Sequence, residues 1–201
     1  VAPPDVYYRL DLDGLRPSKK VRSLLRRAGR ELTVALTATT GRQHRKLVDE
    51  LLATAPLQED SRFIFERLER YAGGGLTRTL RARLRPARDT GSGAPVVLEA
   101  RDAVGRLVAF DIAAFSAGDA AFYLFNFRSR NCYVPGASDL LLAQLIAEAR
   151  IRGNRYVNLG LGINQGVIHF KEKWGATPFL AQCSCVIKRP RSAWEDALDA
   201  L

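Results

Sequence analysis

Apolar residues recur at helical spacing in the first quarter of the chain. Their positions on one side of residues 18–30 predict a helix there, and Ser18 is expected to cap it. Residues 31–37 alternate between apolar and polar as a strand does, and residues 42–54 again follow the helical period. The apolar positions of the two helices are Val21, Leu24, Leu25 and Ala28, then Leu47, Val48, Leu51 and Leu52.

The next segment has a less regular pattern. Residues 59–71 predict a further helix, which the glycines at 73–75 end. Arginines alternate with apolar residues over 76–90, which fits either an exposed strand or a loop, and residues 89–95 have the composition of a loop. The part of the chain over residues 16–75 is therefore expected to be mainly helical.

Strand-like runs dominate the middle of the chain. Three of them are predicted at residues 96–101, 106–115 and 120–127. The connections DAVG and SAGD between them are short enough to be tight turns. These strands are therefore predicted to form an antiparallel meander.

Residues 138–152 give the clearest helical pattern, with Ser138 expected as its cap, Asp139 at its positive end and Gly153 after its last turn. The apolar side of this helix is formed by Leu141, Leu142, Leu145, Ile146 and Ala149. The strand predicted at 155–161 completes a strand–helix–strand unit, so it should run parallel to the last strand of the meander. An antiparallel meander joined to a parallel pair and covered by helices is an α+β (mixed α/β) fold, not a doubly wound sheet.

Glycines 160, 162 and 166 follow a strand-like run in the segment NLGLGINQGVIHFKEKWGA, residues 158–176. Their G-x-G-x-x-x-G spacing departs from the dinucleotide fingerprint because Gln165 stands at the third glycine position, and no G-K-[ST] of a Walker loop occurs. The residues after Gly166 are also too few for the further strands and helices that a dinucleotide-binding fold needs. The segment is therefore predicted to be a turn that leads from a strand into a packed helix.

That short helix is predicted over residues 165–174, with an apolar stripe expected in the core. The stripe is formed by Ile163, Val167, Phe170 and Trp174. Lys171 lies beside the stripe and follows a strand end, where ligands bind in open sheets, whereas His169 is expected at the surface or in a satisfied position. A strand over 179–188 and an amphipathic helix over 192–201 complete the pattern.

Composition narrows the class of partner. The 31 lysines and arginines outnumber the 21 aspartates and glutamates, which gives a net charge of +10. This charge favours nucleic acid, phosphorylated substrates or anionic lipid as partners, and a solvated basic surface is the competing interpretation. No apolar run reaches the roughly 18 residues of a membrane span. The chain has no methionine, even at position 1, so it is expected to be processed or to be a fragment of a longer protein.

The three cysteines, Cys132, Cys183 and Cys185, fit neither a disulfide framework nor a zinc site. Buried, reduced thiols are therefore expected, and with them a cytoplasmic location. No metal site is predicted.

Several segments together resemble the GNAT acyltransferase fold, and within it the Fem-type aminoacyl transferases and their bacterial acyltransferase relatives. The matching segments are KKVRSLLRRAGRELTV, GRLVAFDIAAF, YLFNF, GASDLLLAQLIAEARIRGNRYVNLG and GVIHFKEKWGA, within residues 16–188. The resemblance implies one GNAT-like domain over 1–201 with a sheet core over 96–188. It also implies three layers, in which the meander joins a splayed parallel strand pair and helices cover both faces.

The resemblance also implies where an acyl donor would lie, namely in the opening between the splayed strands. Donor contacts are expected from Phe125, Asn126, Phe127, Arg128, Arg130, Gly136, Ala137 and Ser138. The motif [RQ]-x-x-G-x-[GA] of acetyl-CoA-binding relatives is missing, because the segment before the helix reads RSRNCYVPGAS. Acyl-CoA, an acyl carrier protein and aminoacyl-tRNA therefore stay open as donors, and no permanently bound cofactor is expected.

Four residues are candidates for the chemistry itself. Asp111 is a candidate base for the attacking amine, although an exposed position on an alternating strand is the competing interpretation. Tyr133 is a candidate acid for a thiolate leaving group. Lys171, with the arginines at 128 and 130, would bind phosphate or offset developing negative charge. Asn158 would line the wall formed by the second parallel strand.

The predicted function is N-acyl transfer from a thioester or aminoacyl-tRNA to an amine, as in GNAT and Fem-like N-acetyltransferases and aminoacyl transferases. RNA is expected to reach the basic helix over residues 18–30 and the arginines over 76–88. The alternative is a non-catalytic GNAT-like module that binds nucleic acid or a protein partner. A third hypothesis is a lipid-directed aminoacyl transferase domain severed from a membrane part. Acceptor and oligomeric state stay open.

Overall fold

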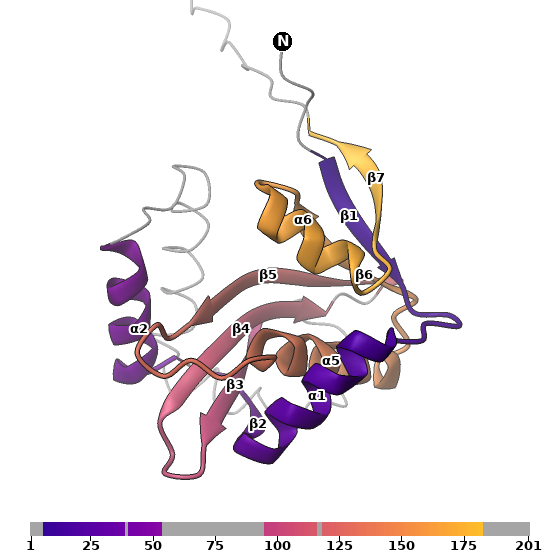
Figure 1. The fold of residues 1–201 in the computed structure, drawn as a ribbon. Coiled ribbons are helices and arrows are strands. Elements are labelled where there is room, and N and C mark those ends of the chain that lie inside the picture. Colours follow the sequence, from indigo (N-terminus) through magenta and orange to yellow (C-terminus); the bar gives the residue numbers. More distant parts are fainter. Residues whose placement is uncertain (1–5, 39, 54–94, 116–117, 183–201) are drawn as a thin grey trace, which may run out of the picture.

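A computed structural model describes residues 6–38, 40–53, 95–115 and 118–182 (Figure 1). Its helices are α1 (Lys19–Glu31), α2 (Arg42–Leu52), α5 (Ala137–Ile151) and α6 (Gln165–Glu172). Its strands are β1 (Val6–Asp11), β2 (Leu32–Thr37), β3 (Pro95–Asp102), β4 (Leu107–Phe115), β5 (Ala120–Arg128), β6 (Tyr156–Leu161) and β7 (Thr177–Ala181). The predictions at 59–71, 76–90, 89–94 and 192–201, and those for Cys183 and Cys185, lie outside the described residues.

The described strands form one mixed sheet of seven, in the order β2-β3-β4-β5-β6-β1-β7. Strands β3 to β5 form an antiparallel meander, as the short turns predict, β2 pairs antiparallel with β3, and β5 pairs with β6 in parallel. Helix α5 is the crossover between these two parallel strands. The predicted fold class, α+β (mixed α/β), is therefore confirmed.

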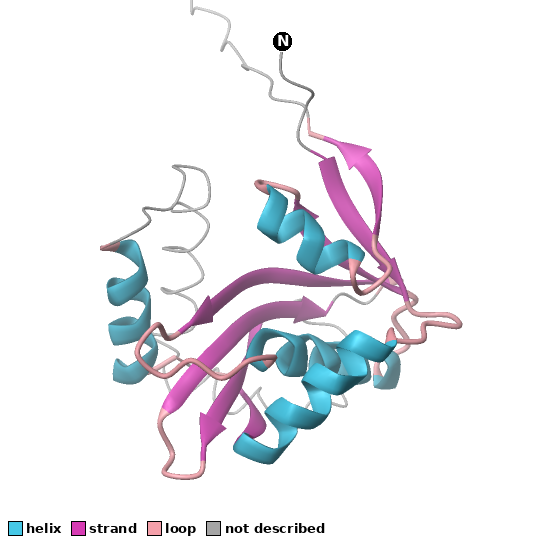
Figure 2. Ribbon diagram, in the orientation of Figure 1, coloured by secondary structure: helices cyan, strands magenta, loops and turns pink. Residues whose placement is uncertain are grey.

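Helices cover both faces of the sheet, which makes three layers (Figure 2). On one face α1 and α5 pack over a large core that includes Val21, Leu98, Leu141 and Leu145. On the other face α2 covers a smaller core around Leu47, Phe110 and Phe127.

Strand β1 was not predicted from the sequence. It lies antiparallel to both β6 and β7, between them, so the two ends of the described chain meet at this side of the sheet (Figure 1). Its inward side chains Tyr8 and Leu10 are buried, as is Leu12 just after it. This alternation of apolar residues was visible in the sequence and is the signal that the prediction missed.

The helix ends confirm one predicted cap and correct another. Ser18 caps α1, because its hydroxyl accepts the N–H of Val21 at 3.2 Å. Helix α5 begins after Gly136, which has a left-handed φ of 87°, and Ser138 is already inside the helix. Ser138 is therefore not the cap, and its hydroxyl is free to bond elsewhere. Gly153, with φ of 79°, follows the last turn as predicted.

Candidate functional site

Strands β5 and β6 pair over only three positions before they separate. Ala120–Phe122 lie opposite Tyr156–Asn158, yet β5 continues to Arg128 and β6 to Leu161. In β5 the register with β4 also shifts, since Ile112 faces Phe125 and Ala113 faces Tyr123. A bulge of this kind leaves backbone groups outside the ladder. The predicted splay is present, and we call the space it leaves the β5–β6 opening.

The turn out of β6 is fixed at Asn158 and Gly160. The Asn158 side-chain oxygen accepts the N–H of Gly160 at 2.8 Å, and Gly160 has a φ of 76°. A side chain starting on Gly160 would lie 3.9 Å from the carbonyl oxygen of Tyr123 and 4.0 Å from Lys171 Nζ. Asn158 therefore shapes one wall of the opening, and both β5 and α6 reach it.

Lys171 is the most unusual charge near this opening. Its side chain is 3% exposed, and Nζ donates to the carbonyls of Gly160 at 2.8 Å and Leu161 at 2.6 Å. The ring of Tyr8 lies 5.5 Å from the amine. Burial lowers the pKa of Lys171 from about 10.5 to about 8. The two carbonyls use two of the three N–H groups, and the amine faces the opening beside Gly160.

The rest of the α6 stripe agrees only in part with the prediction. Trp174 is buried and Phe170 is half-buried against the main core, where its ring stacks 6.4 Å from that of Tyr123. Ile163, however, is 52% exposed. It precedes α6 in the turn, where the helical spacing no longer holds its side chain toward the sheet.

A pocket of about 200 Å³ lies at the N-terminal end of α5. Helix α1, the segment after β5 and helix α6 surround it, and we call it the α5 pocket. Five of the predicted donor-site or catalytic residues line it, namely Arg128, Tyr133, Gly136, Ala137 and Ser138. Leu24, Cys132, Asp139, Phe170 and Lys173 are among the other lining residues. The structure thus brings together the residues predicted around the α5 end.

Gly136 sets the distance between α1 and this pocket. A Cβ on Gly136 would lie 2.8 Å from the carbonyl oxygen of Leu24, closer than backbone atoms allow. The left-handed φ of Gly136 also disfavours any other residue. Helix α1 therefore packs directly on the backbone that begins α5.

Sequence reasoning missed how Asp139 is held. This side chain, 4% exposed, accepts from Trp174 Nε1 at 2.8 Å and contacts Lys173 Nζ at 2.7 Å. These bonds fasten the end of α6 to the first turn of α5, from opposite sides of the pocket. The aromatic–glycine pair at 174–175 and the acidic residue at 139 were visible signals, but nothing in the sequence linked them.

Asp111 lies beneath the pocket at 0% exposure, so the competing prediction of an exposed carboxylate is wrong. Its Oδ1 accepts from Asn126 Nδ2 at 2.6 Å, and Asn126 Oδ1 accepts from the Ser138 hydroxyl at 3.0 Å. Burial raises the pKa of Asp111 well above its usual value near 3.8, and the hydrogen bond from Asn126 opposes this only in part. The three side chains form a polar connection between β4, β5 and α5.

Two predicted donor contacts face the other way. Phe127 is buried in the core beneath α2, and Phe125 packs against it with ring centroids 5.8 Å apart. Because side chains alternate along a strand, only Asn126 of these three points toward α5. Phe125 and Phe127 therefore contribute packing, and their side chains do not reach the α5 pocket.

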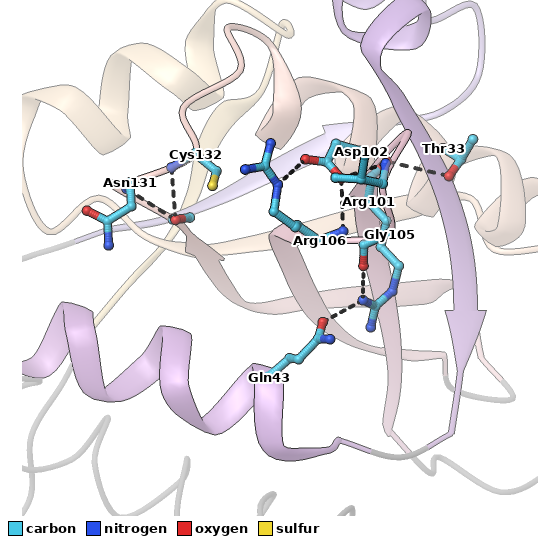
Figure 3. Close-up of polar contacts among 10 residues, drawn as sticks. Thr33, Gln43, Arg101, Asp102, Gly105, Arg106, Asn131 and Cys132 are labelled. Carbon is cyan, nitrogen blue, oxygen red and sulfur yellow. Dashed lines mark hydrogen bonds and ion pairs between the residues drawn. The ribbon is translucent and has the colours of Figure 1, made fainter.

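The segment that carries the rim of the pocket is internally bonded. Ser129 is buried and its hydroxyl accepts the N–H groups of Asn131 and Cys132, each at 3.2 Å. Arg106, which bonds Asp102 at 2.7 Å, lies beside this loop (Figure 3). The loop is therefore a formed structure that positions the residues following it. Arg130 projects from it as an exposed side chain.

Helix α1 carries an uninterrupted basic surface next to the pocket. Its exposed cations are Lys19, Lys20, Arg22, Arg26, Arg27 and Arg30. Arg27 forms an ion pair with Glu31, with Nε 3.9 Å from Oε1. We call this set the α1 basic face.

The strand order, with the antiparallel meander and the splayed parallel pair β5 and β6, is that of the GNAT fold. L-PGS from Bacillus licheniformis shares it with a TM-score of 0.57 and 17% identity, over 89% of this chain and 57% of that one. FemX shares it with a TM-score of 0.53 and 14% identity, over 88% and 59%. A tandem GNAT protein from the clavulanic acid biosynthesis pathway has a TM-score of 0.53 and 18% identity, over 89% and 51%.

At these identities the likeness shows the fold, and the predicted GNAT resemblance is confirmed at that level. The chain spans between half and three fifths of the length of these three proteins. No protein-family profile and no curated protein matches the sequence. Within the described ranges, no helix is long and apolar enough to cross a membrane.

Proposed function

We propose that the protein is an N-acyltransferase of GNAT or Fem-like type that moves an acyl or aminoacyl group from an activated donor to an amine. One observation carries the proposal, namely the buried amine of Lys171 at an opening between two parallel strands. The fold that it shares with FemX and L-PGS supports the same conclusion.

The β5–β6 opening suits a donor carbonyl. The register shift between Tyr123 and Phe125 leaves Leu124 without a facing residue on β4, and in this proposal the backbone there polarises that carbonyl, as preorganised donors do in acyl transfer. A positive charge on Lys171 offsets the negative charge that develops when the amine attacks. Because Lys171 lies in a site of low dielectric, such a charge acts more strongly there than in water.

Asp111 supports the site through hydrogen bonds and does not contact the reacting groups in this proposal. Its burial keeps it from direct contact with an amine, but it connects through Asn126 to Ser138 in the first turn of α5. Its role as a base is therefore indirect in this proposal. The hydrogen-bonded side chains hold the end of α5 in the position that the donor needs.

A transfer screen tests the proposal. The protein is incubated with an amine mixture and, in turn, acetyl-CoA, an acyl carrier protein thioester and aminoacyl-tRNA. Transfer with one donor is expected, with a loss of about a hundredfold or more in Lys171→Ala, the size found when one stabilising donor is removed from an acyl-transfer site. Lys46→Ala, an exposed lysine on α2, is the matched control. Absence of turnover with all three donors, or full activity of Lys171→Ala, would refute it.

The α1 basic face favours an RNA-bearing donor. The affinity of a protein for nucleic acid falls as salt rises, and a plot of log affinity against log salt concentration has a negative slope. Each phosphate neutralised by a lysine or arginine makes this slope steeper by about 0.7 for single strands and about 0.9 for a duplex. Replacing Lys20 and Arg26 with glutamine is expected to reduce this slope by about one to two. Salt-dependent RNA binding without any transfer would instead favour the alternative, a non-catalytic GNAT-like module.

A further inference from the structure

The rim of the α5 pocket exposes an aromatic ring. Tyr133 is 62% exposed and lines the pocket. Arg128, also exposed and also lining the pocket, places its guanidinium carbon 5.6 Å from the centre of that ring. Tyrosine is enriched at binding surfaces because its ring is apolar and its hydroxyl polar, and ligand pockets are lined largely by apolar and aromatic side chains.

This pair of side chains is held in place from both sides. The Ser129 hydroxyl closes the loop before Tyr133, and the N–H of Ala137 donates to the carbonyl of Val134 at 3.2 Å just after it. Gly136 then packs against α1 at Leu24. A preorganised surface loses little conformational entropy when a ligand binds it.

The charges at the floor of the pocket are already paired. Lys173 and Asp139 contact each other at 2.7 Å, so neither is available as a free charge for a ligand. Arg128 forms no ion pair with any of the described residues, and its planar group lies at the rim. The rim therefore offers a flat cation and a ring, while the floor is neutral.

Flat, aromatic groups are the ligands that such a pair recognises. Nucleobases stack on tyrosine rings and on arginine guanidinium planes, whereas flexible acyl chains and protein carboxylates need neither. We propose that Tyr133 and Arg128 form a stacking site for the base of an adenosine-bearing acyl donor. That this ligand is an acyl donor rests on the proposed function. Coenzyme A and the 3′-terminal adenosine of an RNA are the two sources of that chemistry, and a carrier protein thioester with its phosphopantetheine arm lacks it.

Direct binding tests the inference without any turnover. Calorimetry measures binding in two pairs of ligands. The first pair is coenzyme A and 4′-phosphopantetheine. The second pair is an RNA hairpin with a single-stranded 3′-terminal adenosine and the same hairpin with a 3′-terminal pyrimidine nucleotide instead. The member that carries adenosine is expected to bind at least tenfold more tightly in one of the two pairs. That pair identifies the source.

Variants separate stacking from other roles of the ring. Tyr133→Ala should remove the preference for adenosine, a loss of about tenfold to a hundredfold, because one base loses its stacking partner. Tyr133→Phe should keep it, and Arg128→Lys should weaken it because a lysine keeps the charge but not the plane. Phe179→Ala is the control, since Phe179 also lies against an arginine, Arg9, but on β7 outside the pocket.

Equal binding within both pairs, or unchanged binding in Tyr133→Ala, overturns the inference. If the screen finds transfer only from a carrier protein thioester and Tyr133→Ala keeps that activity, the proposed function stands and the stacking site does not. If adenosine binding depends on Tyr133 but no donor turns over, the stacking site stands and the transfer activity does not. A drop in turnover in Tyr133→Phe with unchanged binding would assign the hydroxyl to proton transfer and overturn a purely stacking role.

Discussion

Lys171→Met tests the electrostatics of the β5–β6 opening most directly. The amine is 3% exposed, bonds two carbonyls, and has a pKa lowered by burial from about 10.5 to about 8. One pKa unit corresponds to about 1.4 kcal/mol, so burial disfavours the charged form by about 3 kcal/mol relative to the neutral amine. The methionine side chain has a similar length and carries no proton to lose.

The sign of the pH dependence follows from proton counts. Between pH 8 and pH 10.5 the unfolded chain still holds the proton that the folded protein has released, so the unfolded state binds more protons there. The free energy of unfolding contributed by Lys171 therefore rises with pH in this window. From pH 7 to pH 9.5 the difference, wild type minus Lys171→Met, is expected to increase by about 2 kcal/mol.

Urea unfolding followed by tryptophan fluorescence measures this difference, since Trp174 is buried beside α5. Lys46→Met, at an exposed position on α2, should give a difference that does not change with pH. Parallel pH profiles for wild type and Lys171→Met would show that the amine keeps an ordinary pKa. A difference that falls with pH would contradict the sign.

Three further variants test the surroundings of the α5 pocket. Asp111→Asn should become more stable relative to wild type as pH rises from about 4. The reason is that the raised pKa of Asp111 makes the folded wild type keep a proton that its unfolded chain has lost. Thermal unfolding across pH measures the difference in stability between the two proteins, and a difference that stays constant with pH would argue against it. Gly136→Ala should lower the free energy of unfolding by about 2 kcal/mol or more, because a Cβ there would lie 2.8 Å from the carbonyl oxygen of Leu24 and alanine is strained at a left-handed φ. A stability in urea equal to that of wild type would show that α1 shifts freely. Trp174→Phe should lose about 1 to 3 kcal/mol, because it leaves a buried oxygen of Asp139 without its bond from Nε1. Trp174→Ala should lose more, because it also removes the packing of the ring, and equal losses in the two variants would contradict that contribution.

Local patterns predicted most of the described elements. The periodicity around Val21 and Ala28 predicted α1, and the run around Leu141 and Leu145 predicted α5, because both helices bury a continuous apolar side. The short turns after β3 and β4 predicted the meander. Strand β1 was missed although its apolar alternation was visible, whereas its place between β6 and β7 joins segments far apart along the chain, which local spacing does not indicate.

The site was less accessible to sequence reasoning than the fold. Lys171 was chosen for its place after a strand end, and its burial depends on carbonyls at Gly160 and Leu161 that only the turn presents to it. Phe125 and Phe127 were expected to line the donor site, but strand alternation points them at α2. The contact of Asp139 with Trp174 joins residues of two different helices, and long-range contacts of this kind leave no periodic trace.

The position of β1 has a consequence for synthesis. Residues 6–11 leave the ribosome well before their partners in β6 and β7, which extend to residue 181. At about 5 to 20 residues per second, the partners follow some ten to thirty seconds later. During that interval an apolar segment with Tyr8 and Leu10 stays unpaired while the meander and α5 can already assemble. Strand β1 is thus made before β2 to β6 but joins the sheet only after β6 is in place, and β7 pairs with it in turn.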